Sequence, residues 1–581
     1  MAKKGGAKLY KGVAASPGIA IGKVYLLEEQ ETKINRDKID ITQTDTELTK
    51  YKQAVEKTKQ QLTEIKERVA QKMGEKKAEI FNAHIMILDD PTLTAQVEAK
   101  IKDQQITAEN AVDQVITELI TIFENMEDEY MKERAADIKD VGARIIKNIL
   151  GIPIQTLTDL KEEVIIVAKD LTPSDTAQMD KQKIIGFATD MGGRTSHTAI
   201  MARSLEIPAV VGLSDITQKT KNQDTIIIDG TKGIVEINPD EKALKEYKEK
   251  QQKYIQEVSE LKKQKDLPGQ TKDGHRIELS ANIGTPQDIK GALANGAEGI
   301  GLYRTEFLYM DRDSMPGEEE QFEAYKEVAE KMGGKPVIIR TLDIGGDKNL
   351  PYLNLPEEMN PFLGVRAIRL CLKEREMFKT QLRAILKASN YGNIKIMYPM
   401  ISTIEEVRKA NQILNEVKKQ LSEDNIPYDK NIEVGIMVEV PSTAINADIF
   451  AKEVDFFSIG TNDLIQYTMA VDRMNESLSG LYDPYNPAIL RLIKNVIDAS
   501  HKAGKWTGMC GEMAGEPRAA LILLGMGIDE LSMSAVSIPR VKKVIRSVTK
   551  KHAEEIAEKV MNMGSSDEIC SYLDEELKTL E

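Results

Sequence analysis

The carboxyl-terminal half of the chain alternates short β-rich runs with helical segments, and this alternation restricts the possible folds most. Eight such runs follow Gly274: RIELSANIG, GIGLYRTEFLY, VIIRTLDIG, NIKIMYPM, EVGIMVEVP, DFFSIGTND, KWTGMCGE and ELSMSA. Eight strands alternating with helices over about 300 residues have the number and size of a (β/α)8 barrel. We therefore predict a barrel over residues 266–581.

The amino-terminal half contains a helical block between two β-rich stretches. From Asp45 to Ile149, apolar residues recur at i, i+3, i+4 and i+7, and Pro91 marks a break between long antiparallel helices. We predict a small α/β domain formed by residues 1–43 and 150–238, with helices over 44–149 inserted into it. A charged, glycine-free linker helix is predicted over 239–265. The chain is thus expected to be a multidomain α/β protein.

Composition excludes several classes of function. The 581 residues carry a formal net charge of −14, which disfavours binding to nucleic acid or to anionic membranes. The three cysteines are widely spaced and form neither a disulfide framework nor a C-x-x-C metal site. No apolar run is long enough for a signal peptide core or a bilayer span. We expect a cytoplasmic protein without membrane insertion.

Arginines cluster where barrel strands are predicted to end, the face on which barrel enzymes place their chemistry. Arg304 and Arg340 end two strands, Arg366 follows in a long loop, and Arg473 lies shortly beyond the sixth strand. A single arginine here is most often a surface or ion-pair residue. Several that converge on one rim indicate a substrate with more than one anionic group.

Two carboxylates are expected beside these arginines. Glu439 and Asp463 are predicted at the ends of strands five and six, with Asn462 as a neutral polar neighbour. They could hold a hard divalent cation, or they could only form ion pairs with the arginines, and spacing alone favours neither. The segment DIGGDK (343–348) has a glycine pair that could approach a phosphate, but it is not a P-loop.

Cys510 in GMCGEMAG is predicted to close the seventh strand. A cysteine of a reducing compartment is commonly a small buried apolar residue. On a polar rim it could instead act as an acid or a nucleophile.

His197 lies in GGRTSHTAIMAR, where a loop leads into a predicted helix. Gly192 and Gly193 permit a sharp turn, and Thr195 or Ser196 can cap the helix. A helix amino end favours a phosphoryl group on a side chain there, and neutral imidazole is a good nucleophile. A lone histidine at a helix start is still more often an ordinary solvated residue.

A family resemblance connects these features. The histidine segment resembles the phosphohistidine segment of enzyme I of the bacterial phosphoenolpyruvate:sugar phosphotransferase system. Further stretches resemble the same family in the same order: ASPGIAIGK (15–23), DLTPSDTAQ (170–178), LYRTEFLYM (302–310), NPFLGVRAIR (360–369), IMVEVPS (436–442), SIGTNDLIQYTMAVDR (458–473) and MCGEMAG (509–515).

The resemblance implies a reaction and a role for each site residue. His197 would take a phosphoryl group from phosphoenolpyruvate and pass it to a histidine of the carrier protein HPr, which would dock on the helical block. Cys510 would protonate the enolate carbon to give pyruvate. The implied substrate-binding residues are Arg304, Arg340, Arg366, Asn462 and Arg473, and the implied Mg²⁺ ligands are Glu439 and Asp463. The family also implies a homodimer formed through the barrel.

The helical block suggests how HPr would be recognised. Residues 121–140 hold seven acidic and three basic side chains, which suits a small basic partner. We therefore hypothesise that Glu127, Asp128 and Glu129 take part in transfer to HPr.

Two alternatives remain from the sequence. Phosphoenolpyruvate synthase and pyruvate phosphate dikinase share these modules but need an ATP-grasp domain, for which the sequence is expected to have no room. A non-catalytic regulatory paralogue is expected to lack charged rim residues and to carry an extra amino-terminal sensory domain.

Overall fold

The computed structural model describes residues 8–27, 33–73, 75–124, 129–152, 157, 160, 162–172, 175, 179, 183–193, 196–205, 207–310, 312–346, 350, 352–353, 358–473 and 475–580. The chain forms two compact units, residues 1–257 and 258–581. No helix in the described ranges has the length and apolar character that crossing a bilayer requires.

The first unit contains an eight-stranded sheet with the order β1-β8-β7-β3-β4-β5-β6-β2. Its strands are β1 (Lys8–Lys11), β2 (Val13–Ser16), β3 (Ile19–Leu27), β4 (Val164–Ala168), β5 (Ile184–Thr189), β6 (Ala209–Val211), β7 (Thr225–Asp229) and β8 (Ile234–Ile237). The run from β3 to β6 is parallel, and the fully buried β4 has apolar side chains on both faces. Helix α7 (His197–Leu205) packs on one face, and α8 (Ile216–Lys219) packs on the other. β7 and β8 pair antiparallel and form a hairpin.

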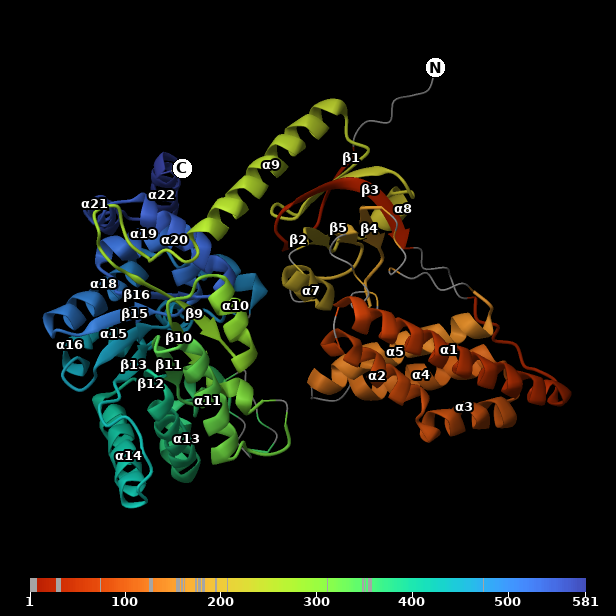
Figure 1. Cartoon of the computed structure of the whole chain (residues 1–581), viewed down its shortest axis with the longest axis horizontal. Coiled ribbons are helices and arrows are strands. Elements are labelled where there is room, and N and C mark those ends of the chain that lie inside the picture. Colours follow the sequence, from red (N-terminus) through yellow and green to blue (C-terminus); the bar gives the residue numbers. More distant parts are fainter. Residues whose placement is uncertain are drawn as a thin grey trace. The chain divides into compact units, whose positions relative to one another are not determined.

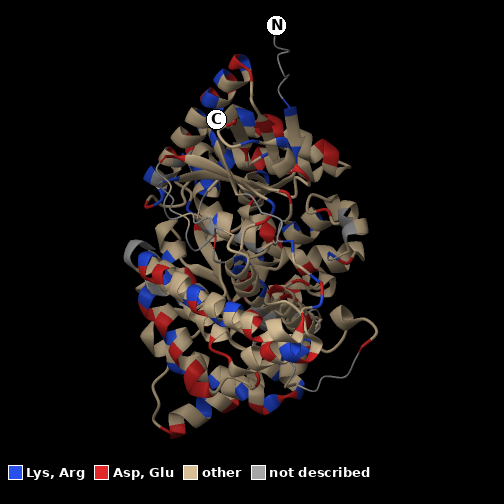
Figure 2. Cartoon of the chain, turned by 90° about the vertical axis from the view of Figure 1, so that its right-hand side faces the viewer, with Lys and Arg blue, Asp and Glu red and all other residues tan. Residues whose placement is uncertain are grey.

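A helical block is inserted between β3 and β4, as predicted (Figure 1). It comprises α1 (Thr44–Met73), α2 (Glu75–Leu88), α3 (Pro91–Gln104), α4 (Ala108–Glu124) and α5 (Glu129–Ile149). The break predicted at Pro91 is confirmed, because Asp90 caps α3 by accepting a hydrogen bond from Thr92 N at 2.7 Å. The buried apolar face of α1 has helical spacing and consists of Tyr51, Ala54, Leu62, Ile65 and Val69. Figure 2 shows acidic and basic residues on the surface of the helices.

The charged segment after β8 forms the helix α9 (Glu241–Gln264), and the boundary between the two units falls within it. The second unit is a closed barrel of parallel strands with helices around it (Figure 1). All eight β-rich runs of the sequence become strands: β9 (Glu278–Ile283), β10 (Ile300–Arg304), β11 (Val337–Arg340), β12 (Ile394–Tyr398), β13 (Val434–Val438), β14 (Phe456–Ile459), β15 (Trp506–Met509) and β16 (Glu530–Met533). The predicted fold, multidomain α/β with a (β/α)8 barrel, is confirmed.

The helices of the second unit cover the outside of the barrel or join its strands. They are α10 (Ile289–Ala294), α11 (Glu318–Met332), α12 (Ile368–Lys373), α13 (Arg375–Ala388), α14 (Ile404–Glu423), α15 (Pro441–Ile445), α16 (Ala447–Phe450), α17 (Thr461–Met469), α18 (Pro487–Lys502), α19 (Pro517–Met526), α20 (Ile538–Ser547), α21 (Lys550–Met561) and α22 (Ser566–Leu580). Side chains alternate along each strand, so Val337 and Ile339 pack toward the helices while Ile338 joins a separate cluster inside the barrel. This alternation determines which residues reach the barrel mouth.

Candidate active site

The strand period of two places polar side chains at the carboxyl end of the barrel. Three strands carry an inward apolar residue and, two positions later, a polar residue of the mouth. These pairs are Leu302 and Arg304, Ile338 and Arg340, and Met437 and Glu439. Since side chains two residues apart point to the same face of a strand, the polar group of each pair lies above the inward apolar one.

A cavity of about 260 Å³ lies at this mouth. Its lining includes seven of the residues selected from the sequence: Arg304, Arg340, Glu439, Asn462, Asp463, Arg473 and Cys510. The structure thus brings together side chains from four of the strand ends and from the segment 462–473. Arg366 is not among the lining residues; its side chain is 1% exposed, beside Asp343 and Asp463.

Arg340 is a buried guanidinium held by carboxylates on two sides. Its Nη2 donates to Glu306 Oε1 at 2.6 Å, and its Nη1 lies 3.1 Å from Asp343 Oδ2. Burial opposes the charged form, but the charges of Glu306, Asp343 and Glu439 outweigh it and hold the pKa of Arg340 above its ordinary value. This arginine therefore stays charged.

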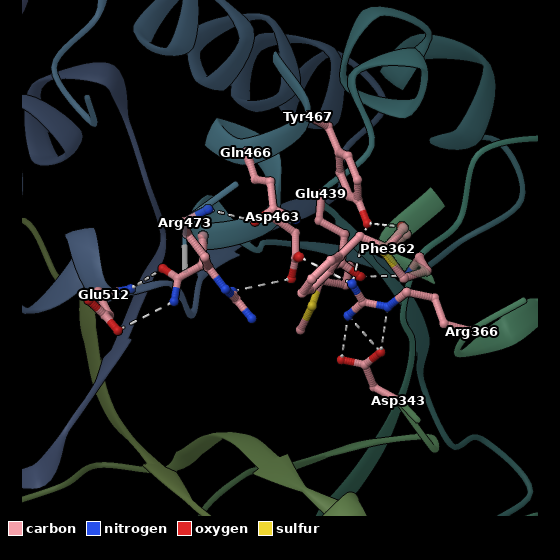
Figure 3. Close-up of polar contacts among 12 residues, drawn as sticks. Asp343, Phe362, Arg366, Glu439, Asp463, Gln466, Tyr467, Arg473 and Glu512 are labelled. Atoms are coloured by element: carbon pink, nitrogen blue, oxygen red, sulfur yellow. Dashed lines mark hydrogen bonds and ion pairs between the residues drawn. The ribbon is translucent and has the colours of Figure 1, made fainter. Parts of the chain in front are cut away.

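Arg366 extends the same network (Figure 3). Its Nη2 donates to Asp343 Oδ1 at 3.0 Å, and its Nη1 donates to Asp463 Oδ1 at 3.3 Å. Its Nη1 also donates to the Tyr467 hydroxyl at 3.3 Å. Burial again opposes the charge, while Asp343, Asp463 and Glu439 raise the pKa of Arg366 above its usual value.

The two candidate metal ligands differ in their surroundings. Asp463 lies in the first turn of α17, four residues after β14, so the prediction that it ends a strand was wrong in detail. It pairs with Arg366 and, at 3.8 Å, with Arg473 Nη1. Glu439 directly follows β13 and accepts a hydrogen bond from Met400 N at 2.5 Å. Asp463 thus makes ion pairs with two arginines and also lines the cavity, and its role as a metal ligand stays a prediction.

The electrostatics of Glu439 fit a bound cation. Burial, with the neighbouring charges of Asp463 and Asp343, raises the pKa of Glu439 to about 8. A divalent cation among these oxygens would offset that repulsion. Within the described residues no group of three or more His, Cys, Asp or Glu side chains forms a metal site. A hard cation held by Glu439 and Asp463 would thus take its other ligands from substrate and water.

Asn462 and Arg473 lie on the side of the cavity near α17. Asn462 Oδ1 accepts a hydrogen bond from Glu512 N at 3.1 Å, and Asn462 Nδ2 donates to Glu512 Oε1 at 3.5 Å. The backbone N–H of Arg473 donates to Gln466 Oε1 at 3.1 Å. The Asn462 bonds attach the start of α17 to the segment after β15, and the Arg473 bond attaches the loop after α17 to its own helix.

Arg304 differs from the buried arginines because its side chain is exposed at the cavity. Its guanidinium lies 5.0 Å from the centre of the Phe307 ring. It is therefore the more accessible cation for an incoming anion.

Cys510 directly follows β15 and is 5% exposed. Its backbone N–H donates to Ile459 O at 3.1 Å, and its carbonyl accepts from Asn282 Nδ2 at 3.0 Å. Burial raises the pKa of the thiol to about 12. The group therefore keeps its proton at neutral pH, as an acid must, and this argues against a thiolate nucleophile.

His197 is the first residue of α7, as predicted. Ser196 Oγ accepts a hydrogen bond from Ala199 N at 3.3 Å and so caps the helix, and Gly192 has a φ of +108° in the preceding turn. The His197 side chain and Thr195 lie outside what the structure describes.

Three acidic residues of the site were missed by the sequence analysis: Glu306, Asp343 and Glu512. Glu306 and Asp343 each lie two or three residues beyond a rim arginine in the sequence. That proximity was the available signal, but a carboxylate near an arginine is common on any loop.

The chain matches known families over most of its length. Residues 258–550 match the PEP-binding domain of PEP-utilising enzymes, 11–134 match their N-terminal domain, and 160–233 match their mobile domain. The chain is therefore a phosphoenolpyruvate-utilising enzyme, and the barrel with its cavity falls within the match to the PEP-binding domain.

Curated relatives narrow this class. The chain is 55% identical to the phosphoenolpyruvate-protein phosphotransferase of Staphylococcus carnosus, over 98% of this chain and 100% of the relative. It is also 55% identical to that of Bacillus subtilis, over 98% and 99%. An NMR solution structure of Enzyme I is 52% identical over 42% of this chain and 99% of its own, with a TM-score of 0.40. The chain belongs to the phosphoenolpyruvate-protein phosphotransferase family, and the predicted family and enzyme class are confirmed.

Proposed function

We propose that this protein transfers the phosphoryl group of phosphoenolpyruvate to His197 and then to a histidine of HPr, releasing pyruvate. The observation that carries this proposal is the cavity, whose lining brings together three arginines, five carboxylates and a protonated thiol. Such a site matches a small substrate with phosphate and carboxylate groups and a carbon that must gain a proton. This would be the first step of sugar uptake by the phosphotransferase system.

The arginines would bind and orient the substrate. Arg304, Arg340 and Arg473, with Asn462, line the cavity and would bind the phosphate and carboxylate. Arg366 would contribute positive charge from behind Asp463. Fixed charges and donors of this kind stabilise phosphoryl transfer mainly through positioning and neutralisation.

Glu439 and Asp463 would hold Mg²⁺. When bound, the ion would neutralise charge that develops as the phosphoryl group leaves the enolate oxygen. Cys510 would hold its proton at Sγ until the enolate forms and then deliver it to the carbon, which completes pyruvate. Tautomerisation of the enol to pyruvate would drive the step, so ATP is not needed.

The first unit, which carries His197 and the helical block, would deliver the phosphoryl group to HPr. His197 and the barrel site belong to different units, so His197 must reach the cavity and afterwards turn to HPr. We assign HPr docking to residues 44–149, presentation of His197 to residues 1–43 and 150–238, the connection to 239–265 and substrate binding to 266–581. Glu127 and Asp128 lie outside the described residues, as does the side chain of Glu129. Charge reversal at these three positions is expected to slow transfer to HPr without affecting labelling of His197, and unchanged transfer would reject this role.

The protein is further proposed to be a cytoplasmic homodimer formed through the barrel. Ile445 and Ile449 support an interface, because they are 61% and 45% exposed on the neighbouring helices α15 and α16. Sedimentation equilibrium of the whole protein tests the dimer, and a monomer at micromolar concentration would contradict it.

The central experiment is incubation with phosphoenolpyruvate labelled in the phosphoryl group. Acid-labile label is expected on the wild-type protein with Mg²⁺, and it should be lost with EDTA and in His197→Ala. Label that persists in His197→Ala would refute the proposal. Labelling from ATP without phosphoenolpyruvate would favour the dikinase alternative, and no labelling at all would favour a regulatory paralogue.

A further inference from the structure

Asp343 lies between the two most buried arginines of the site. Its Oδ2 is 3.1 Å from Arg340 Nη1, and its Oδ1 accepts from Arg366 Nη2 at 3.0 Å and from Arg366 Nε at 3.3 Å. The Asp343 side chain is 2% exposed. Because a guanidinium presents its donors in a fixed plane, a carboxylate shared by two of them restricts both their separation and their tilt.

The glycines after Asp343 permit this arrangement. Gly345 has a φ of +109°, and a Cβ built there would lie 2.5 Å from Arg366 Cβ and 2.8 Å from Val365 O. Ala367 N also donates to Ile344 O at 2.9 Å. The backbone of 343–346 therefore lies directly against the backbone that carries Arg366, and any side chain at position 345 would push the two apart.

We propose that the segment 343–346 is an arginine-positioning element: Asp343 and Gly345 set the mutual placement of Arg340 and Arg366 for phosphoenolpyruvate. This positioning role rests on the proposed function. It differs from the sequence-based hypothesis that the glycine pair of DIGGDK approaches a phosphate directly. Asp343 acts through the arginines and is a positioning residue. Glu306 supports the same geometry from the other side of Arg340, because its Oε1 accepts a hydrogen bond from Arg340 Nη2 at 2.6 Å.

The first test is Asp343→Asn, which keeps the size of the side chain and removes its charge. The measurements are the single-turnover rate of His197 labelling at saturating phosphoenolpyruvate, the half-saturating concentration, and the inhibition constant of inorganic phosphate. Misplaced groups cost up to about 100-fold in rate, so we expect the maximal rate to fall by about 10- to 100-fold. Phosphate is expected to inhibit at least as tightly as in the wild type, since the arginines lose a neutralising charge.

The matched control is Asp574→Asn. Asp574 accepts two hydrogen bonds from Arg518, both at 2.6 Å, and it does not line the cavity. Its variant is expected to label within twofold of the wild-type rate. A maximal rate within twofold of the wild type in Asp343→Asn would overturn the proposal. It would also be overturned if the phosphate constant and the half-saturating concentration rose by the same factor, because Asp343 would then support anion binding as such and not the geometry of the arginines.

A second variant tests geometry with every charge retained. Gly345→Ala is expected to lower the maximal rate at least tenfold relative to Gly334→Ala. Gly334 is the control because its φ is also positive, at +87°, while nothing lies within 4 Å of a Cβ built there. Equal rates in the two alanine variants would overturn the proposal, even where Asp343→Asn does not fold.

Different results would reject the positioning role and the proposed function. A wild-type protein that takes no label from phosphoenolpyruvate rejects both. A labelled wild type with unaffected Asp343 and Gly345 variants rejects only the positioning role.

Discussion

Cys510 is predicted to resist alkylation far more than an ordinary cysteine. Burial raises its pKa to about 12, compared with an ordinary value of 9.0. At pH 8 the thiolate fraction is then about one in ten thousand, compared with about one in ten for the ordinary thiol. The thiolate is the nucleophile, so alkylation should be about 1,000-fold slower than for a free thiol, even before limited access is considered.

The assay is alkylation with iodoacetamide between about pH 7 and pH 9, with each modified cysteine identified by peptide mass spectrometry. Cys570 provides an internal comparison, because it is only partly buried, although burial raises the pKa of its thiol too. Cys371 is fully buried, and burial raises its pKa as it does that of Cys510. Cys510 should remain unmodified while Cys570 reacts. If Cys510 reacted at the rate of free cysteine, or its rate levelled off near pH 9, the thiol would not be a protonated acid at neutral pH. The functional counterpart is Cys510→Ala, in which pyruvate formation is expected to fall by about 100- to 10,000-fold.

Further variants test the remaining structural arguments. Burial and the charge of Glu278 raise the pKa of Glu530 from 4.5 to about 8, so the folded state binds more protons than the unfolded state between these values. Glu530 should therefore make the free energy of unfolding fall as pH rises through that window, by up to about 1.4 kcal/mol per pH unit. Because Glu439 contributes a decline in the same window, urea titrations should show a shallower decline in Glu530→Gln than in the wild type, and an equal slope would contradict the argument. Arg340→Lys should reduce the labelling rate about 100-fold, because an ammonium cannot reproduce the two-sided contact with Glu306 and Asp343; a near-normal rate would contradict this. Phe81→Ala, at a fully buried site of the helical block, should destabilise the block by about 3–5 kcal/mol in calorimetry, and an unchanged melting profile would count against the described packing.

Much of the fold could be predicted because its signals are local. Eight short apolar runs, each bounded by helical segments, became eight barrel strands, and Pro91 marked a true helix boundary. Ser196 and Gly192 similarly marked the start of α7, because capping and positive φ depend on residue type at a few neighbouring positions.

The sequence predicted which residues belong to the candidate site, but not which of them line the cavity and which are buried behind it. The motifs identified Arg304, Arg340, Glu439 and Cys510, and strand alternation places all of them at the cavity. The same motifs gave no indication that Arg366 is buried beside Asp463, 97 residues away in the chain. Pairing across that separation depends on which strands close the barrel and how each loop returns.

The sequence by itself therefore determined the order of elements, the chemical groups present and the family, since these depend on residue type and short-range spacing. Only the tertiary structure decided which arginine is exposed and which carboxylates neutralise the buried arginines. It also decided that the segment 343–346 lies against the backbone of Arg366. Burial and Coulomb interactions depend on distance in space, so groups far apart in the chain acquire their ionisation and orientation only when the barrel closes.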